Sequence, residues 1–105
     1  MKRAELETKF REIVKRDTKL DAQEQLALLD QYLYAWDGAD CGLCGEELQN
    51  RLSRIAGVLD YLDFMDKIKT DEALWMLMNE IEAFAYKVAE DWSNSSWSAE
   101  KAVQA

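Results

Sequence analysis

The sequence contains no histidine and no proline, and it has only four glycines and two cysteines in 105 residues. Without histidine, Ser–His and Cys–His catalytic pairs, histidine-containing zinc sites and histidine pH switches are all excluded. Without proline, long segments can remain helical without interruption. Apolar runs are only a few residues long, so no segment is expected to span a membrane.

Length and apolar content predict a single domain, residues 1–105, with a core of its own. Apolar residues make up 49% of the chain, which is typical of a globular protein. A chain of this length buries roughly two thirds of its surface on folding, so stability requires neither a disulfide nor a metal. The first seven residues are mostly charged and lack the apolar segment of a signal peptide, so we expect a cytoplasmic protein.

Charge is unevenly distributed along the chain, whose 21 acidic and 13 basic residues give a net charge of −8. Residues 1–19 contain seven basic and four acidic residues, whereas residues 20–50 contain seven acidic residues and no basic one. Such an acidic surface repels phosphates, so we expect no direct nucleic-acid binding except through the first helix. Two interpretations remain open: the acidic excess keeps the protein soluble, or it steers the protein towards a partner with a basic surface.

Helical periodicity covers nearly the whole chain, because apolar residues recur at spacings of three and four. We therefore predict an all-α fold, a small antiparallel bundle of three long helices at about 21–37, 46–69 and 71–92. A short amphipathic helix at about 2–16 is expected to pack across them and to bury Leu6, Phe10, Ile13 and Val14. Serines interrupt the pattern after residue 92, so residues 93–105 are expected to form a loose tail, with a final helical turn from Trp97 to Val103 as the alternative.

Local signals refine the second and third helices. Asp21 and Glu24 have the spacing of a capping box, and Gly38 suits the left-handed residue that follows a helix end. The second helix is expected to have a wide apolar face, formed by Leu26, Leu29, Leu33 and Trp36 and by an adjacent stripe of Leu28, Tyr32 and Ala35. The third helix carries a coiled-coil-like seam of Leu48, Leu52, Ile55, Leu59 and Leu62. A second stripe beside this seam consists of Val58, Tyr61, Met65 and Ile68.

The fourth helix follows the third after only two or three residues in this prediction, so the two helices must be antiparallel. Its apolar positions are Leu74, Leu77, Met78, Ile81, Phe84, Ala85, Val88 and Trp92.

The most specific local motif is Cys41-Gly-Leu-Cys44, in the predicted loop between two long helices. Two cysteines at this spacing can supply two of the four ligands of a zinc ion. The remaining ligands would come from nearby carboxylates, or from Cys41 and Cys44 of a second copy in a homodimer that shares one zinc. Redox chemistry is disfavoured because the surrounding acidic residues oppose a thiolate. The simpler alternative is two reduced thiols in a glycine-rich turn.

Asp60, Asp63 and Asp66 recur at every third residue of the third predicted helix. Each step of three rotates the side chain by about 60° around the helix axis, so these carboxylates form a slanted ridge. Such a ridge can imitate a row of DNA phosphates and occupy the nucleic-acid-binding groove of a partner. A solvated helix face is the simpler alternative. A di-iron centre is disfavoured because its Glu-x-x-His motifs need histidine.

Aromatic residues provide a third set of candidates, because tryptophan and tyrosine are enriched at protein interfaces. Trp36 and Trp92 fall on the apolar stripes of their helices, so we expect them in the core. Trp75 and Tyr86 lie off the main apolar face of the fourth helix, and Trp97 lies in the polar tail. These last three residues are predicted to contact a second subunit or another protein.

Together these features predict a small acidic, non-enzymatic protein-binding module that inhibits or regulates a basic, nucleic-acid-handling protein. In size and charge alone it is comparable to phage anti-defence proteins, immunity proteins and antitoxins. The predicted contact residues are Asp30, Asp37, Asp40, Glu46, Glu47, Asp60, Asp63, Asp66, Trp75, Tyr86 and Trp97.

Two alternatives remain open. One is a structural protein whose chains are joined by a zinc ion at Cys41 and Cys44. The other is an enzyme that uses carboxylates such as Asp60 or Asp63 with a divalent ion. No cofactor other than zinc is predicted.

Overall fold

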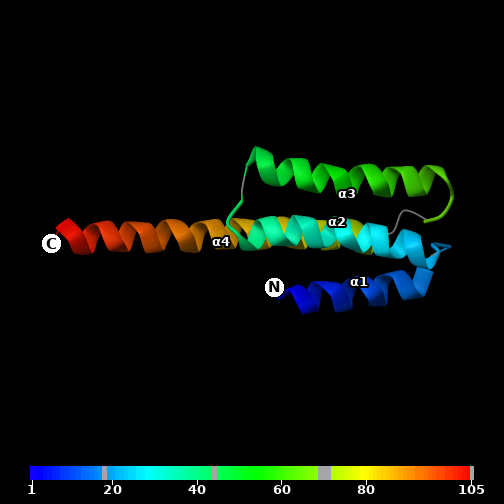
Figure 1. Cartoon of the computed structure of the whole chain (residues 1–105), viewed down its shortest axis with the longest axis horizontal. Coiled ribbons are helices and arrows are strands. Elements are labelled where there is room, and N and C mark those ends of the chain that lie inside the picture. Colours follow the sequence, from blue (N-terminus) through cyan, green and yellow to red (C-terminus); the bar gives the residue numbers. More distant parts are fainter. Residues whose placement is uncertain (18, 44, 69–71, 105) are drawn as a thin grey trace.

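The computed structural model describes residues 1–17, 19–43, 45–68 and 72–104, without the side chains of Asp17 and of residues 93–104. These residues form four α-helices, which are α1 (Arg3–Asp17), α2 (Ala22–Asp40), α3 (Glu46–Phe64) and α4 (Glu72–Gln104). Consecutive helices run in opposite directions (Figure 1). The expected all-α bundle is therefore confirmed.

The α2 helix is the central element, because its contacts with the other three helices are more extensive than those of α4, which also touches all three. The α1 and α3 helices lie on opposite sides of the pair formed by α2 and α4 (Figure 1). The α1 helix runs alongside α2, whereas we expected it to cross the bundle. Among the described side chains, two ion pairs join α1 to the rest of the bundle: Arg3 Nε lies 3.4 Å from Asp37 Oδ1, and Lys9 Nζ lies 3.4 Å from Glu80 Oε1. The basic first helix is thus part of the bundle.

The core follows the predicted apolar faces for most of the chain. All four apolar residues of the α1 face and all five of the α3 seam are buried, as expected. Tyr32 links α2 to two neighbours: its ring lies 5.4 Å from that of Phe10, and its hydroxyl donates a 2.6 Å hydrogen bond to the Leu74 carbonyl oxygen. Trp36 is buried as predicted and stacks on Phe84, with ring centroids 5.8 Å apart.

The start of α2 has the predicted capping box. The Glu24 backbone N–H donates to Asp21 Oδ1 at 2.8 Å, and the Asp21 backbone N–H donates to Glu24 Oε1 at 3.3 Å. These two bonds satisfy amides that have no partner within the helix. The bond from the Glu24 amide is the main reason why the pKa of Asp21 lies below its ordinary value.

The end of α2 lies further along the chain than predicted. Gly38 is inside the helix, and Gly42, with φ 83°, is the left-handed residue. The Gly42 N–H donates to the Ala39 carbonyl at 3.0 Å and the Leu43 N–H to the Gly38 carbonyl at 2.9 Å, which is the Schellman pattern. Gly38 instead makes room for Arg51, because a Cβ there would lie 2.8 Å from Arg51 Nη1.

The end of α3 comes earlier than predicted, at Phe64. Asp66 takes the left-handed conformation, with φ 56°. Its N–H donates to the Asp63 carbonyl at 2.9 Å, and the Lys67 N–H donates to the Leu62 carbonyl at 2.9 Å, so α3 also ends in a Schellman motif. The described residues 65–68, which lie between α3 and α4, already outnumber the two or three residues expected for this connection.

Four residues expected in the core are exposed: Leu26, Tyr61, Met65 and Trp92. Trp92 is 64% exposed because it lies past the end of α2, where a Cβ at Gly42 would be 4.0 Å from its ring. The helix break expected after residue 92 is also absent, because the α4 backbone continues to Gln104. Residues 93–96 include no proline or glycine, the residues that interrupt helices most strongly.

The molecule is elongated, with principal extents of 60 × 24 × 20 Å. The carboxyl-terminal half of α4 accounts for this length, since it extends beyond the other three helices (Figure 1). Within the described ranges, no helix is both long and apolar enough to cross a lipid bilayer.

Candidate protein-binding surface

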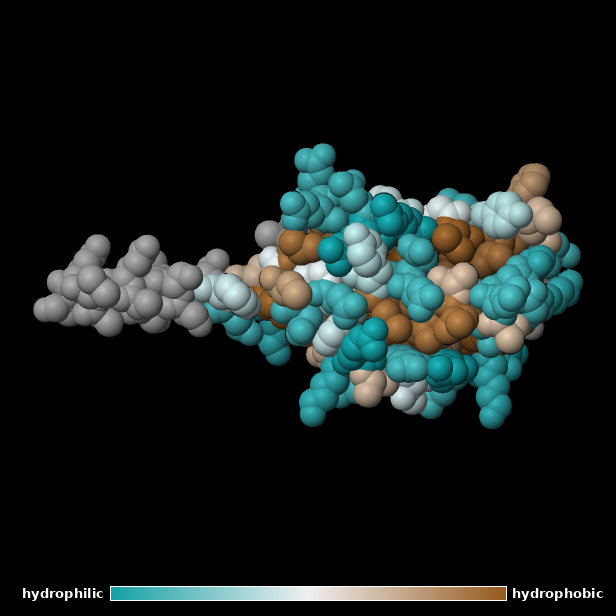
Figure 2. Space-filling model, viewed as in Figure 1, coloured by the Kyte–Doolittle hydropathy of each residue, from teal (hydrophilic) through white to brown (hydrophobic). Residues whose placement is uncertain are grey.

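Exposed apolar and acidic side chains alternate at the carboxyl-terminal end of α3. Phe64 is 85% exposed, Tyr61 60% and Met65 46%. The three carboxylates between and beside them are also exposed. We call this set the α3 tip, and it comprises Asp60, Tyr61, Asp63, Phe64, Met65 and Asp66. Figure 2 shows apolar side chains projecting where α3 ends, at the upper right.

The α3 tip is held in place by buried residues on either side of it. Leu59 and Leu62 face the core, so the residues between and after them point outwards. The Schellman motif then turns the chain at Asp66, and Ile68 is buried again. The tip thus stands on a helix end that is anchored by packing.

The α3 tip keeps most of its negative charge. Asp60 and Asp63 have no ion pair within the described part of the chain. Asp66 Oδ2 lies 3.5 Å from Lys19 Nζ, but both side chains are largely exposed, so this pair contributes little. Lys67 is engaged elsewhere, with its Nζ 2.7 Å from Glu24 Oε2, and this hydrogen bond raises the pKa of Lys67.

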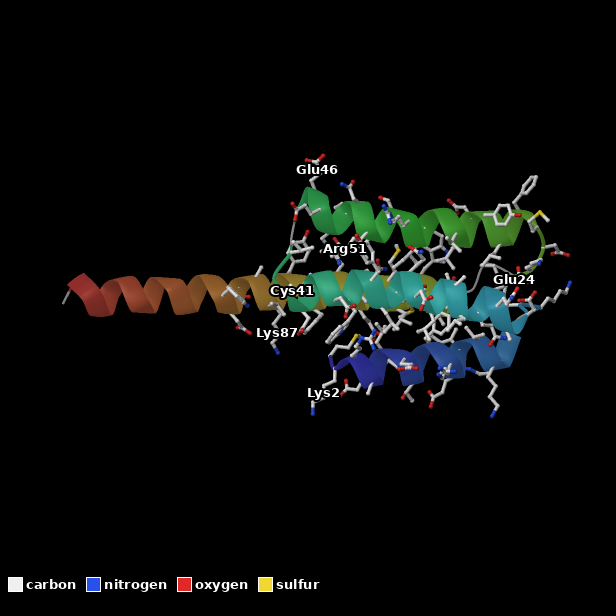
Figure 3. All side chains as sticks on the ribbon, viewed as in Figure 1. Lys2, Glu24, Cys41, Glu46, Arg51 and Lys87 are labelled. Carbon is white, nitrogen blue, oxygen red and sulfur yellow. The ribbon has the colours of Figure 1, made fainter. Side chains whose placement is uncertain are left out.

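The other predicted acidic residues lie away from the tip. Asp40 ends α2, and Glu46 and Glu47 begin α3, so they are at the opposite end of the bundle. Figure 3 shows Glu46 and Cys41 at that end, far from Glu24. Asp30 and Asp37 are exposed along α2, and Asp37 is paired with Arg3. The structure therefore divides the predicted acidic surface into separate groups.

The predicted aromatic contacts are also dispersed. Trp75 is half-buried in the first turns of α4 and packs against the core. Tyr86 is exposed further along α4. The side chain of Trp97 lies outside the described residues. Their roles in binding stay predictions.

The predicted zinc ligands are only partly described. Cys41 follows α2 directly, and its side chain is exposed. Cys44 lies outside the described residues. Among the residues that the structure does describe, no group of three or more cysteine, aspartate or glutamate side chains is arranged to hold a metal ion. The shared zinc stays a prediction.

Sequence reasoning missed the three apolar residues of the tip. Tyr61 and Met65 were assigned to a buried stripe, and Phe64 received no role. One signal was present: the α3 seam would continue four residues after Leu62 at position 66, which is an aspartate. An acidic residue at a core position indicates that the packed part of the helix has ended.

No protein-family model matches this chain, and comparisons with curated proteins and with solved structures give no match either.

Proposed function

We propose that this protein is a non-enzymatic binding module that docks on the basic surface of a partner protein through the α3 tip. The supporting observation is the alternation of exposed Tyr61, Phe64 and Met65 with exposed carboxylates. The partner is a protein that handles nucleic acid, and docking inhibits or regulates it. The exposed thiol of Cys41 fits a reducing compartment, so we place the module in the cytoplasm.

The apolar and acidic residues of the tip have different tasks in this proposal. Phe64 enters an apolar pocket on the partner, since a few buried aromatic residues supply most of the affinity at interfaces. The carboxylates remain at the rim, where charge complementarity raises the association rate and fixes orientation more than it adds affinity. A groove that binds nucleic-acid phosphates has the basic rim that Asp60 and Asp63 require.

The test is affinity capture from the native host at physiological salt, followed by binding measurements with the purified partner. Phe64→Ser is compared with Met76→Ser, because Met76 is also a largely exposed apolar residue, 63% exposed on α4 against 85% for Phe64. We expect Phe64→Ser to weaken binding by about thirtyfold or more, and Met76→Ser to leave it unchanged. Both variants should fold normally because both side chains are exposed.

A second comparison tests the carboxylates. Asp60→Asn with Asp63→Asn removes two charges at the tip, and Asp30→Asn with Glu46→Gln removes two exposed charges elsewhere. The tip variant should lower the association rate and its salt dependence more than the control variant does. Equal effects of the two pairs, or a captured partner whose contact surface is acidic, would refute the proposal.

A further inference from the structure

Two arginines of α3 converge on one tyrosine of α2. The guanidinium carbon of Arg51 lies 3.9 Å from the centroid of the Tyr34 ring, and that of Arg54 lies 5.5 Å from it. They are the only basic residues between Lys19 and Lys67. Neither forms an ion pair with any carboxylate of the described chain, although the protein has a large acidic excess.

Arg51 is fixed in place before any ligand arrives. Its Nη1 donates a 2.7 Å hydrogen bond to the Tyr34 carbonyl oxygen, and its guanidinium packs where Gly38 has no side chain. Figure 3 shows Arg51 reaching from α3 towards α2. A guanidinium has five N–H donors, so most donors of Arg51 remain available. Its fixed position reduces the entropy lost on binding.

A groove of about 420 Å³ lies beside these arginines. It is lined by Tyr34, Leu43, Glu47, Asn50, Arg51 and Arg54. The Asn50 amide adds two further N–H donors to those of the guanidiniums. Glu47 is the one carboxylate of the lining, so the groove carries a net positive charge within an acidic protein.

We propose that this groove binds a phosphate group between Arg51 and Arg54, with Asn50 as an additional donor. A phosphate offers more acceptor oxygens than a carboxylate and about two negative charges at neutral pH, so it can engage two guanidiniums at once. The phosphate is either free or carried on an aromatic group that packs against the partly exposed side chain of Tyr34. This site is separate from the α3 tip and goes beyond the proposed function.

The experiment is a titration of the full ¹⁵N-labelled chain with inorganic phosphate, phenyl phosphate and acetate at constant ionic strength, followed by NMR. We expect saturating shifts confined to Tyr34, Asn50, Arg51 and Arg54 with either phosphate compound, in the millimolar range. Tighter binding of phenyl phosphate identifies the ring-borne source, and equal binding identifies free phosphate. Acetate should bind more weakly than both.

The decisive variant is Arg54→Gln, because Arg54 is exposed and its side chain makes no hydrogen bond to any residue that the structure describes. It should weaken phosphate binding by about tenfold or more. Arg11→Gln is the matched control, since Arg11 is an exposed arginine of α1 paired with Glu7. Unsaturable shifts spread over all basic residues, acetate binding as tight as phosphate binding, or equal effects of the two variants would overturn the proposal.

Discussion

Asp66 occupies at the end of α3 the position that Gly42 occupies at the end of α2. Both residues have a positive φ, 56° for Asp66 and 83° for Gly42, and in both cases the N–H of that residue and the N–H of the next residue donate the two Schellman hydrogen bonds. Glycine adopts this conformation without steric cost, whereas a residue with a Cβ pays about 1–2 kcal/mol for it. The candidate binding surface therefore ends on a strained residue.

Asp66→Gly should stabilise the protein by about 0.5–1 kcal/mol. The relief of backbone strain exceeds the additional entropy of a glycine in the unfolded chain. The lost pair with Lys19 matters little because it is exposed. Urea denaturation measures the change, and Gly42→Ala is the reciprocal control, which should destabilise the protein. A neutral or destabilising Asp66→Gly would contradict this account of the α3 end.

Tyr32→Phe should destabilise the protein by about 1 kcal/mol, because it removes the hydrogen bond from a buried hydroxyl to the Leu74 carbonyl. Tyr34→Phe is the control, since the Tyr34 ring is partly exposed and its contact with Arg51 does not need the hydroxyl. Chemical denaturation of both variants gives the comparison. Equal stability of the two variants would show that the Tyr32 bond contributes nothing.

Periodicity was sufficient to predict which faces of the helices are buried. The seam from Leu48 to Leu62 and the α1 face are buried because apolar residues that repeat about every 3.6 positions form a stripe along one side of a helix. Such a stripe is removed from water only by packing against neighbouring helices. The Asp21 capping box was predictable for a similar reason, since both of its bonds are local. Asp60, Asp63 and Asp66 were found by their spacing alone.

Periodicity could not predict where a packing partner ends. Trp92 continues the apolar spacing of α4 but lies beyond α2, and Tyr61 is exposed although Val58 of the same stripe packs against the core and Ile68 is buried. The sequence predicts the helix-ending turn at Gly38, whereas Gly42 makes it. A glycine can serve either as the left-handed residue of a turn or as space for a neighbouring side chain, and Gly38 does the second for Arg51. That choice depends on tertiary contacts.

The stability of the protein should fall in acid partly through Asp21. The folded-state pKa of Asp21 is below its ordinary value of 3.8, chiefly because of the hydrogen bond from the Glu24 amide. Its contribution is therefore complete above that value and is lost as the pH falls through the lower, folded-state pKa. Asp21→Asn caps the helix equally well but does not titrate.

Thermal unfolding of the wild type and of Asp21→Asn, measured from near-neutral pH into acid, provides the test. The wild type should lose stability relative to the variant only below the ordinary pKa of an aspartate. Lys67 affects stability at the other end of the pH range. Because its pKa in the folded protein is raised, its contribution to folding stability is present at neutral pH and is lost only as the pH rises through that pKa. A constant difference between wild type and Asp21→Asn across the acid range would count against the titration of Asp21.

The zinc hypothesis has a direct test. If two chains share one zinc through Cys41 and Cys44, protein purified without a chelator should contain about half a zinc ion per chain and should be dimeric. Cys41→Ser should then release the metal and give monomers, as measured by metal analysis and light scattering. Metal well below that ratio, with an oligomeric state that Cys41→Ser does not change, would exclude a shared zinc.

The central position of α2 has a consequence for how the molecule opens. The α1 and α3 helices lie on opposite sides of the α2 and α4 pair, so either can detach while α2 remains packed. Exposure of the α2 amides, in contrast, requires contacts with all three neighbours to break. Amide hydrogens of α2, and of the part of α4 that packs against it, should therefore exchange most slowly, close to the rate set by global unfolding, and those of α1 and α3 should exchange faster through separate local openings.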